Sequence, residues 1–298
     1  MFFSEHFQIG EKGHSLYDFI DIDLVRDNKL FIDPTLIGLG SDPWSKKARE
    51  CIDSFFDSLF WGFKTDDVRD LLSHAHEQNA TKLGYGHTGV NGKGKTPDGL
   101  DYSMGNIKRL VQEIPSISQC EDLPVLVEGI AEDCMSDMLT NILHKQLNEF
   151  TATQMQKYRI PHNCIRPFFT WSIEEKRWKE VYAPCWTYKG KEILLVPKWI
   201  VRRKYLFRAH QYLMVVIIER LRIEQSKNSS TKKEIWTTLE RLSEHWEYEY
   251  IKTYTQKHPD ALDEYHRRLP SYYLRTNGQL SDDDLDFHVY GTKSIKTA

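Results

Sequence analysis

Residues 125–148, VLVEGIAEDCMSDMLTNILHKQLN, decide how we expect the chain to fold and where we expect its chemistry. The apolar VLV at 125–127 leads into a segment whose apolar residues recur at helical spacing. If a helix begins at Asp133, steps of about 100° per residue place a polar stripe within an arc of roughly 80°. The stripe contains Asp133, Asp137, Asn141, His144 and Asn148.

Two interpretations of this stripe are open. In one, it is a solvated helix face, and Asp133 is stabilised by the positive end of the helix dipole. In the other, Glu128, Asp133 and Asp137 hold Mg²⁺ or Mn²⁺, because carboxylate oxygens at a strand-to-helix junction suit such an ion and leave room for water. The metal hypothesis gives Asp133 and Asp137 catalytic roles as well.

Asp33 is a further candidate metal ligand. The alternating patterns YDFIDIDL at 17–24 and KLFIDPTLI at 29–37 predict two short strands joined by a turn. Asp33 ends the second strand just before Pro34, where a rigid sheet would hold its carboxylate at the rim of a cleft. The alternative is that Asp33 caps the turn that Pro34 begins.

Residues 83–99, LGYGHTGVNGKGKTPDG, form a glycine-rich segment with six glycines and two lysines. Glycine allows backbone amides to approach an anion closely, and Lys93 and Lys95 supply positive charge for a phosphate or a nucleic-acid backbone. The segment does not open a helix directly after a strong strand, which the dinucleotide-binding fingerprint requires. A surface loop without a ligand is the alternative.

The pattern changes to strands from Arg166 onward, with RPFFTW, RWKEVYAPCWTY and EILLVPK predicting a small antiparallel sheet. Lys198 directly follows the last of these strands and is our candidate for positioning water or phosphate. Glu174 to Lys176 contain the ExK tail of the PD-(D/E)xK nuclease signature, but they lie at a predicted hairpin tip.

A long basic helix is expected over residues 197–224, and in it Arg202 and Arg203 are candidate phosphate contacts. Arg203 and His210 also have the Rx6H spacing of some helical ribonuclease domains. That spacing would imply ribose chemistry without a metal ion.

Charge, hydropathy and cysteine content limit the class of protein. The 298 residues include 40 basic and 43 acidic side chains, so any polyanion site must be a local patch. We expect no signal peptide and no membrane segment, since the longest apolar cluster is far below the ~20 residues that span a bilayer. Five cysteines without a CxxC pair argue against a disulfide framework and a zinc knuckle, and favour a cytoplasmic location.

The segment SKNSSTKK at 226–233 is the clearest break in the chain. We therefore expect an α+β core domain over residues 1–225 and a helical C-terminal region with a polar tail over residues 226–298. The expected fold class is α+β, with an N-terminal β-hairpin, a helical middle, a small antiparallel sheet and a helical C-terminal region.

The combination of LFIDP, the glycine-rich loop, EGIAEDCMSDMLTNIL and LLVPKWIVRR resembles a family of uncharacterised bacterial proteins that accompany restriction or phage-defence functions. The resemblance covers roughly residues 15–205 and implies no catalytic residue. It implies a defence role. We expect nucleic acid and a companion defence protein as partners, and the hydropathy predicts no contact with a membrane.

The leading hypothesis is a Mg²⁺- or Mn²⁺-dependent nuclease effector that cleaves DNA or RNA. Its metal site would comprise Asp33, Glu128, Asp133 and Asp137. The alternative is a non-catalytic adaptor or sensor that binds a partner protein or a nucleotide through the glycine-rich loop and the basic helix. A metal-independent ribonuclease is a further alternative.

Overall fold

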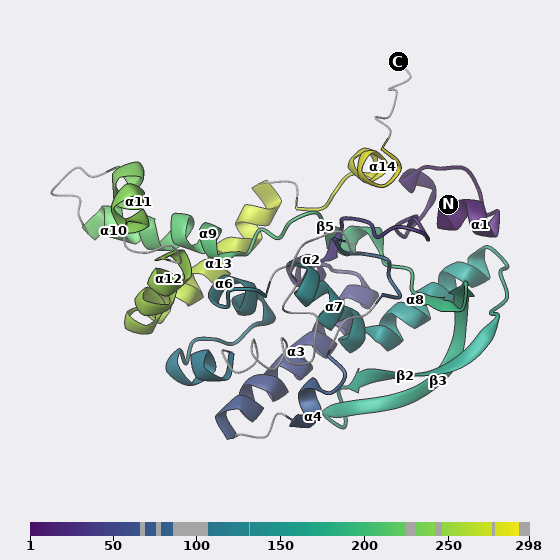
Figure 1. The fold of residues 1–298 in the computed structure, drawn as a ribbon, viewed down its shortest axis with the longest axis horizontal. Coiled ribbons are helices and arrows are strands. Elements are labelled where there is room, and N and C mark those ends of the chain that lie inside the picture. The colour runs from purple at the N-terminus through teal and green to yellow at the C-terminus, as the bar shows by residue number, and fades with distance from the viewer. Residues whose placement is uncertain are drawn as a thin grey trace, which may run out of the picture.

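The computed structural model describes residues 1–65, 69–75, 79–85, 107–130, 132–224, 231–241, 246–275 and 278–291. Helices dominate the ribbon, and one small antiparallel sheet curves around one end of the molecule (Figure 1). The expected α+β class is therefore confirmed.

The first half of the chain contains α1 (Phe3–Phe7), a 3-10 turn (His14–Leu16), β1 (Phe31–Ile32), α2 (Pro34–Leu39), α3 (Pro43–Thr65), α4 (Arg69–Leu72), a helix at 107–113, a 3-10 turn (Cys120–Asp122), α6 (Leu123–Leu126) and α7 (Glu132–Ile142). The second half contains α8 (His144–Lys157), β2 (Cys164–Ser172), β3 (Arg177–Tyr188), β4 (Lys191–Ile193), a 3-10 turn (Lys198–Ile200), β5 (Val201–Arg202), α9 (Ala209–Tyr212), a π-helical turn (Leu213–Ile217), α10 (Ile218–Glu224), α11 (Lys232–Glu240), α12 (Trp246–Lys257), α13 (Asp260–Arg275) and α14 (Asp282–Tyr290).

Helix α3 supplies the central packing surface. The Asp42 carboxylate accepts a hydrogen bond from the Ser45 amide at 2.9 Å, which caps the helix start beside Pro43. The apolar side chains on one face of α3 are buried, and Phe55 packs edge-on against Trp171 at a centroid distance of 5.1 Å. The helical spacing of the aromatic residues thus places them in the core.

Strands β2, β3 and β4 form the predicted antiparallel sheet, in which Trp171 pairs with Trp178. The two long strands form a curved ribbon alongside α8 and α3 (Figure 1). This register also places Cys164 opposite Cys185.

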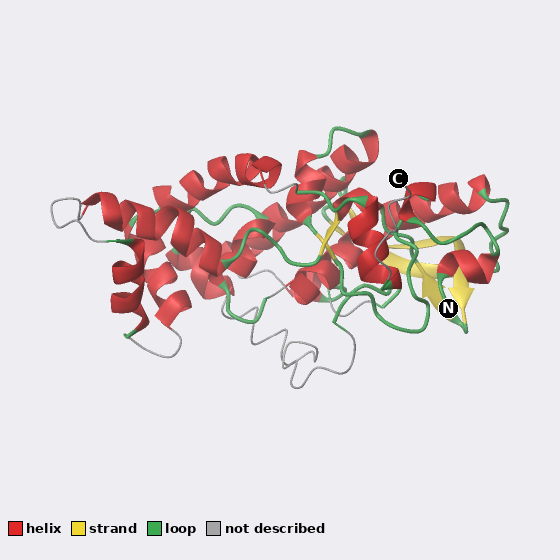
Figure 2. Ribbon diagram, turned by 90° about the horizontal axis from the view of Figure 1, so that it is seen from above, coloured by secondary structure: helices red, strands yellow, loops and turns green. Residues whose placement is uncertain are grey.

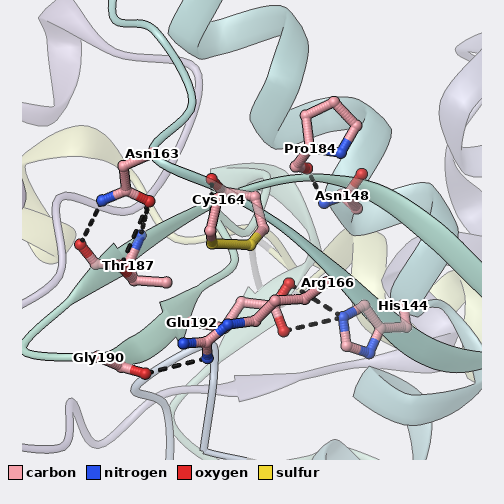
Figure 3. Close-up of a disulfide and its surroundings, with 10 residues drawn as sticks. His144, Asn148, Asn163, Cys164, Arg166, Pro184, Thr187, Gly190 and Glu192 are labelled. Atoms are coloured by element: carbon pink, nitrogen blue, oxygen red, sulfur yellow. Dashed lines mark hydrogen bonds and ion pairs between the residues drawn. A yellow bond between two sulfur atoms is a disulfide. The ribbon is translucent and has the colours of Figure 1, made fainter.

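A disulfide joins Cys164 to Cys185, with a Cα–Cα distance of 5.5 Å (Figure 3). The expectation that the cysteines form no disulfide was therefore wrong. The odd count of five misled the prediction, because only strand register brings these two together while Cys51, Cys120 and Cys134 are free.

The N-terminal strands pair differently from a simple two-strand hairpin. Residues 17–24 are extended chain with isolated bridges, one of them between Phe19 and Pro197. Strand β1 pairs with β5, so that Ile32 lies opposite Val201, and Pro34 then starts helix α2. The long helix expected over 197–224 is consequently divided into a 3-10 turn, a strand and shorter helices.

The C-terminal helices pack in two places. Helices α9 to α13 gather at one end of the molecule, whereas α14 lies next to the N-terminal segment (Figures 1 and 2). Helix α13 continues through Pro270. Within the described part of the chain, none of the helices combines the length and apolar character needed to cross a bilayer.

Candidate functional site

The predicted polar stripe lies on two helices instead of one. Helix α7 ends at Ile142 and α8 begins at His144, so the stripe is divided at Leu143. Asp133 and Asp137 are half-buried on α7. The stripe is therefore not a fully solvated face.

The α8 half of the stripe supports the sheet. The His144 ring stacks on Phe168 at a centroid distance of 4.0 Å, and its Nε2 lies 3.3 Å from the Glu192 carboxylate. The Asn148 side chain donates a hydrogen bond to the Pro184 carbonyl at 3.0 Å (Figure 3). These buried polar groups are paired, as the cost of burial requires, and their role is structural.

The α7 half of the stripe lies at the root of the glycine-rich segment. The Tyr85 amide donates to the Asp133 carboxylate at 3.4 Å, and the Tyr205 amide donates to the Glu132 carboxylate at 3.3 Å. Burial raises the pKa of the Tyr85 hydroxyl, and the charges of Glu132 and Asp133 raise it further. Two acidic side chains, Glu132 and Asp133, therefore lie next to Tyr85, the last described residue of this part of the segment.

This root is fixed by backbone hydrogen bonds. Gly84 donates to the Asn28 carbonyl at 2.9 Å, and the Asn28 amide donates to the Lys82 carbonyl at 2.8 Å. Gly84 has φ of +134°, and a Cβ there would lie only 2.7 Å from Asp133 Oδ1. Only glycine suits this close approach.

The two lysines of the glycine-rich segment, Lys93 and Lys95, lie outside the described residues, and so does the loop that carries them. Their predicted role as phosphate contacts stays a prediction.

Asp33 is fully buried and caps helix α2. Its Oδ1 accepts hydrogen bonds from the Thr35 and Leu36 amides at 2.9 and 3.4 Å, and its Oδ2 accepts one from the Tyr273 hydroxyl at 2.7 Å. Burial raises the pKa of Asp33 to about 7, although these hydrogen bonds and the Arg202 charge favour the ionised form. The capping interpretation is confirmed.

Lys198 takes part in a contact between the N-terminal segment and helix α14, and not in a contact with Asp33. Its ammonium group donates to the His14 carbonyl at 2.8 Å and to the Asp282 carboxylate at 2.7 Å. It joins the N-terminal segment to helix α14. Among the described residues, no three His, Cys, Asp or Glu side chains are arranged to hold a metal ion.

The predicted basic residues Arg202, Arg203 and His210 do not share one helix. Arg202 donates to the Gly278 carbonyl and lies 5.5 Å from the centroid of the Tyr273 ring, whereas Arg203 is exposed. His210 lies on α9, past the break in the expected helix, with its Nδ1 3.7 Å from Glu247. Helical register therefore does not relate Arg203 to His210.

The ExK motif lies at the tip of the β2–β3 hairpin, as expected. The Glu175 carboxylate pairs with Arg177 and Lys179, and Glu174 accepts from the Ser172 hydroxyl at 3.0 Å. These local pairs account for the charges at the tip.

A buried polar cluster that sequence reasoning missed joins the two ends of the chain. His14 Nδ1 lies 2.7 Å from the Asp286 carboxylate, and the Asp21 amide donates to His14 Nε2 at 3.2 Å. The Tyr290 hydroxyl and the Ser4 hydroxyl both donate to Asp21, at 2.8 and 2.6 Å. No sequence spacing indicates this cluster, because its members come from opposite ends of the chain.

The sequence does contain one further signal. Residues 89–96, GVNGKGKT, satisfy the spacing GxxxxGK[ST] of the phosphate-binding P-loop. The described residues on either side are an isolated bridge at Leu83 and a helix at 107–113. The spacing alone indicates phosphate, because the residues that directly flank it lie outside the described part of the chain.

The fold and these contacts define an α+β protein whose C-terminal helices are joined to its core by buried polar side chains. The chain belongs to the DUF8370 family, described as a domain of unknown function, whose model matches residues 8–208. No curated protein matches the chain. No solved structure matches it either.

Proposed function

We propose that this protein is a non-enzymatic sensor or adaptor that binds a phosphate-bearing ligand, a nucleotide or a nucleic acid, through its glycine-rich segment. The observation that carries the proposal is the engagement of Asp33 and Lys198. Asp33 Oδ1 caps helix α2, and Asp33 Oδ2 and the ammonium group of Lys198 are bound in contacts that attach the C-terminal helices. A hydrolytic site would need such groups to face substrate.

The glycine-rich segment supports the ligand class. Lys93 and Lys95 lie within GVNGKGKT, where backbone amides and a lysine suit a phosphate group. The segment leaves the core next to Gly84, whose backbone is held by Asn28. The described end of the segment is therefore held in place beside the core.

The joined C-terminal helices support a sensing role. Their contacts to the core include the Tyr273–Asp33 hydrogen bond and the Lys198–Asp282 ion pair, at 2.7 Å each. Polar contacts of this kind can exchange with water when the helices move, which gives a ligand a conformational equilibrium to shift.

Binding can be tested by titrating ATP, GTP, single-stranded RNA and duplex DNA into the full-length protein, with and without Mg²⁺. We expect at least one of these ligands to bind, and the double variant Lys93→Ala, Lys95→Ala to lose about tenfold in affinity, or about 1.4 kcal/mol. The control is Lys46→Ala, Lys47→Ala on the surface of α3, which removes the same charge. Equal losses in both variants, or no binding by the wild type, would contradict the proposal.

A metal-dependent nuclease is the second candidate, favoured by the acidic start of α7 at the loop root. In this candidate Glu128, Asp133 and Asp137 would have to rearrange to hold Mg²⁺ or Mn²⁺, because the described residues contain no three such side chains arranged to bind a metal ion. The same samples decide between the two functions. Cleavage that requires metal and disappears in Asp137→Asn would replace the adaptor proposal, and cleavage in chelator would favour the metal-independent ribonuclease. A cytoplasmic location, a phage-defence role and a companion protein stay predictions.

A further inference from the structure

A cavity lies among the C-terminal helices, far along the chain from the glycine-rich segment. It has a volume of about 220 Å³ and lies between the π-helical turn and helix α13. The lining side chains combine two arginines, two tyrosines, one amide and two aliphatic groups: Gln211, Val215, Tyr265, Arg268, Leu269, Tyr272 and Arg275.

The amide of Gln211 is the first indication of a ligand. The residue is only 7% exposed and lines the cavity. Within the described ranges its side chain makes no hydrogen bond to the protein, and its polar atoms are not among the fully buried atoms without a partner, so they are open to the cavity. The amide is therefore available to a polar group of a ligand that enters the cavity.

Positive charge is the second indication. Arg275 lines the cavity and its guanidinium has no carboxylate partner among the described residues, since its Nε donates to the Ser271 carbonyl at 3.3 Å. Arg268 donates to the Val215 carbonyl at 2.7 Å and pairs with Glu264, which fixes its position at the cavity. Arg275 therefore carries a positive charge that no carboxylate among the described residues neutralises.

The cavity walls indicate the chemistry of the rest of the ligand. Tyr265 and Leu269 are buried, and Val215 belongs to the π-helical turn, a geometry that often marks functional positions. The Tyr265 hydroxyl is already bonded to the Leu206 carbonyl at 3.3 Å, so that side chain presents mainly its ring. Apolar side chains and arginines in one cavity suit a ligand with one flat apolar group and one anionic group.

We propose that this cavity binds a small ligand that carries an oxyanion, a phosphate or a carboxylate, on a single ring or a group of similar size. Arg275 and Arg268 bind the oxyanion, because guanidinium groups match its planar or tetrahedral oxygens. Gln211 hydrogen-bonds the ligand, and the side chains of Val215 and Leu269 contact its apolar part. The site is separate from the glycine-rich segment and does not depend on the function proposed for it.

The probes are phenyl phosphate and benzoate, titrated into the full-length protein by calorimetry. We expect one of them to bind, and Arg275→Ala and Gln211→Leu each to weaken that binding about tenfold. Preference for phenyl phosphate would assign a phosphate ligand, and preference for benzoate a carboxylate. Arg268 is not substituted, since its loss would also break the Val215 and Glu264 contacts.

The matched control is Arg267→Ala, which removes an exposed arginine from the same helix outside the cavity. Its affinity for the probe should equal that of the wild type, as should that of Lys93→Ala, Lys95→Ala. Thermal melts establish that each variant is folded. The site is ruled out if neither probe binds the wild type at millimolar concentration, or if Arg267→Ala weakens binding as much as Arg275→Ala.

Discussion

Asp33 illustrates how a residue that the sequence predicts as a metal ligand can have a structural role in the fold. The Asp-Pro pair predicts a helix or turn start, and that part of the prediction is confirmed by its bonds to the Thr35 and Leu36 amides. Its second oxygen bonds Tyr273, 240 positions away. That contact, together with burial, removes the carboxylate from any solvent-accessible site.

Removal of the Tyr273 hydroxyl should destabilise the protein. In Tyr273→Phe the buried Asp33 oxygen loses its 2.7 Å donor, and hydrogen bonds to ionisable groups contribute about 1.5–3 kcal/mol. Urea unfolding should report a loss of that size. Tyr182→Phe is the control, because Tyr182 is 68% exposed, and a similar loss there would argue against a specific role for the Asp33 contact.

At the scale of elements, the β2–β3 ribbon is held both by its ladder and by a covalent bond. The disulfide closes a separation of 21 residues between Cys164 and Cys185. His144 of α8 stacks on Phe168 of β2 and contacts Glu192 of β4. The ribbon is thus attached to the helical core through α8.

Reduction of the disulfide should lower stability. A closed loop of this length stabilises by about 3 kcal/mol, mainly by restricting the unfolded chain. We expect the melting temperature of the oxidised wild type to fall on addition of dithiothreitol. Cys164→Ser, Cys185→Ser should already melt at the lower temperature and should not respond to the reductant. A wild type that melts identically with and without reductant would contradict this contribution.

At the scale of the whole molecule, the two ends of the chain are joined by the cluster around His14. Helix α14 carries Asp286 and Tyr290, and the N-terminal segment carries His14 and Asp21. Burial lowers the pKa of His14, and this outweighs the opposing effects of Asp286, Asp21 and Asp282. His14 therefore stays neutral, with its Nε2 accepting from the Asp21 amide.

Acid should loosen this contact. Because the folded pKa of His14 is lower than the unfolded value of 6.5, the unfolded state binds the proton more readily, and stability falls as pH decreases through that value. We expect the difference in unfolding free energy between wild type and His14→Gln to shrink from pH 8 to pH 5. His162→Gln, at an exposed position, should show no such trend. A pH-independent difference for His14→Gln would exclude its titration.

The sequence by itself determined local elements of this protein: the Asp33 cap, the three strands of the sheet and the hairpin tip at Glu174. Each depends on residues close together in the chain, where periodicity and capping chemistry act directly. The sequence also indicated the glycine-rich segment as a phosphate candidate. The metal-site hypothesis grouped Asp33, Glu128, Asp133 and Asp137, because the linear sequence does not distinguish a buried structural carboxylate from a metal ligand.

Only the tertiary structure decided which of these groups meet. It paired β1 with β5, Cys164 with Cys185, Asp33 with Tyr273 and Lys198 with Asp282. Such contacts depend on how whole elements bury their apolar faces, which no local pattern specifies. The cavity beside Arg275 has the same origin, since it exists only where α13 packs against the π-helical turn.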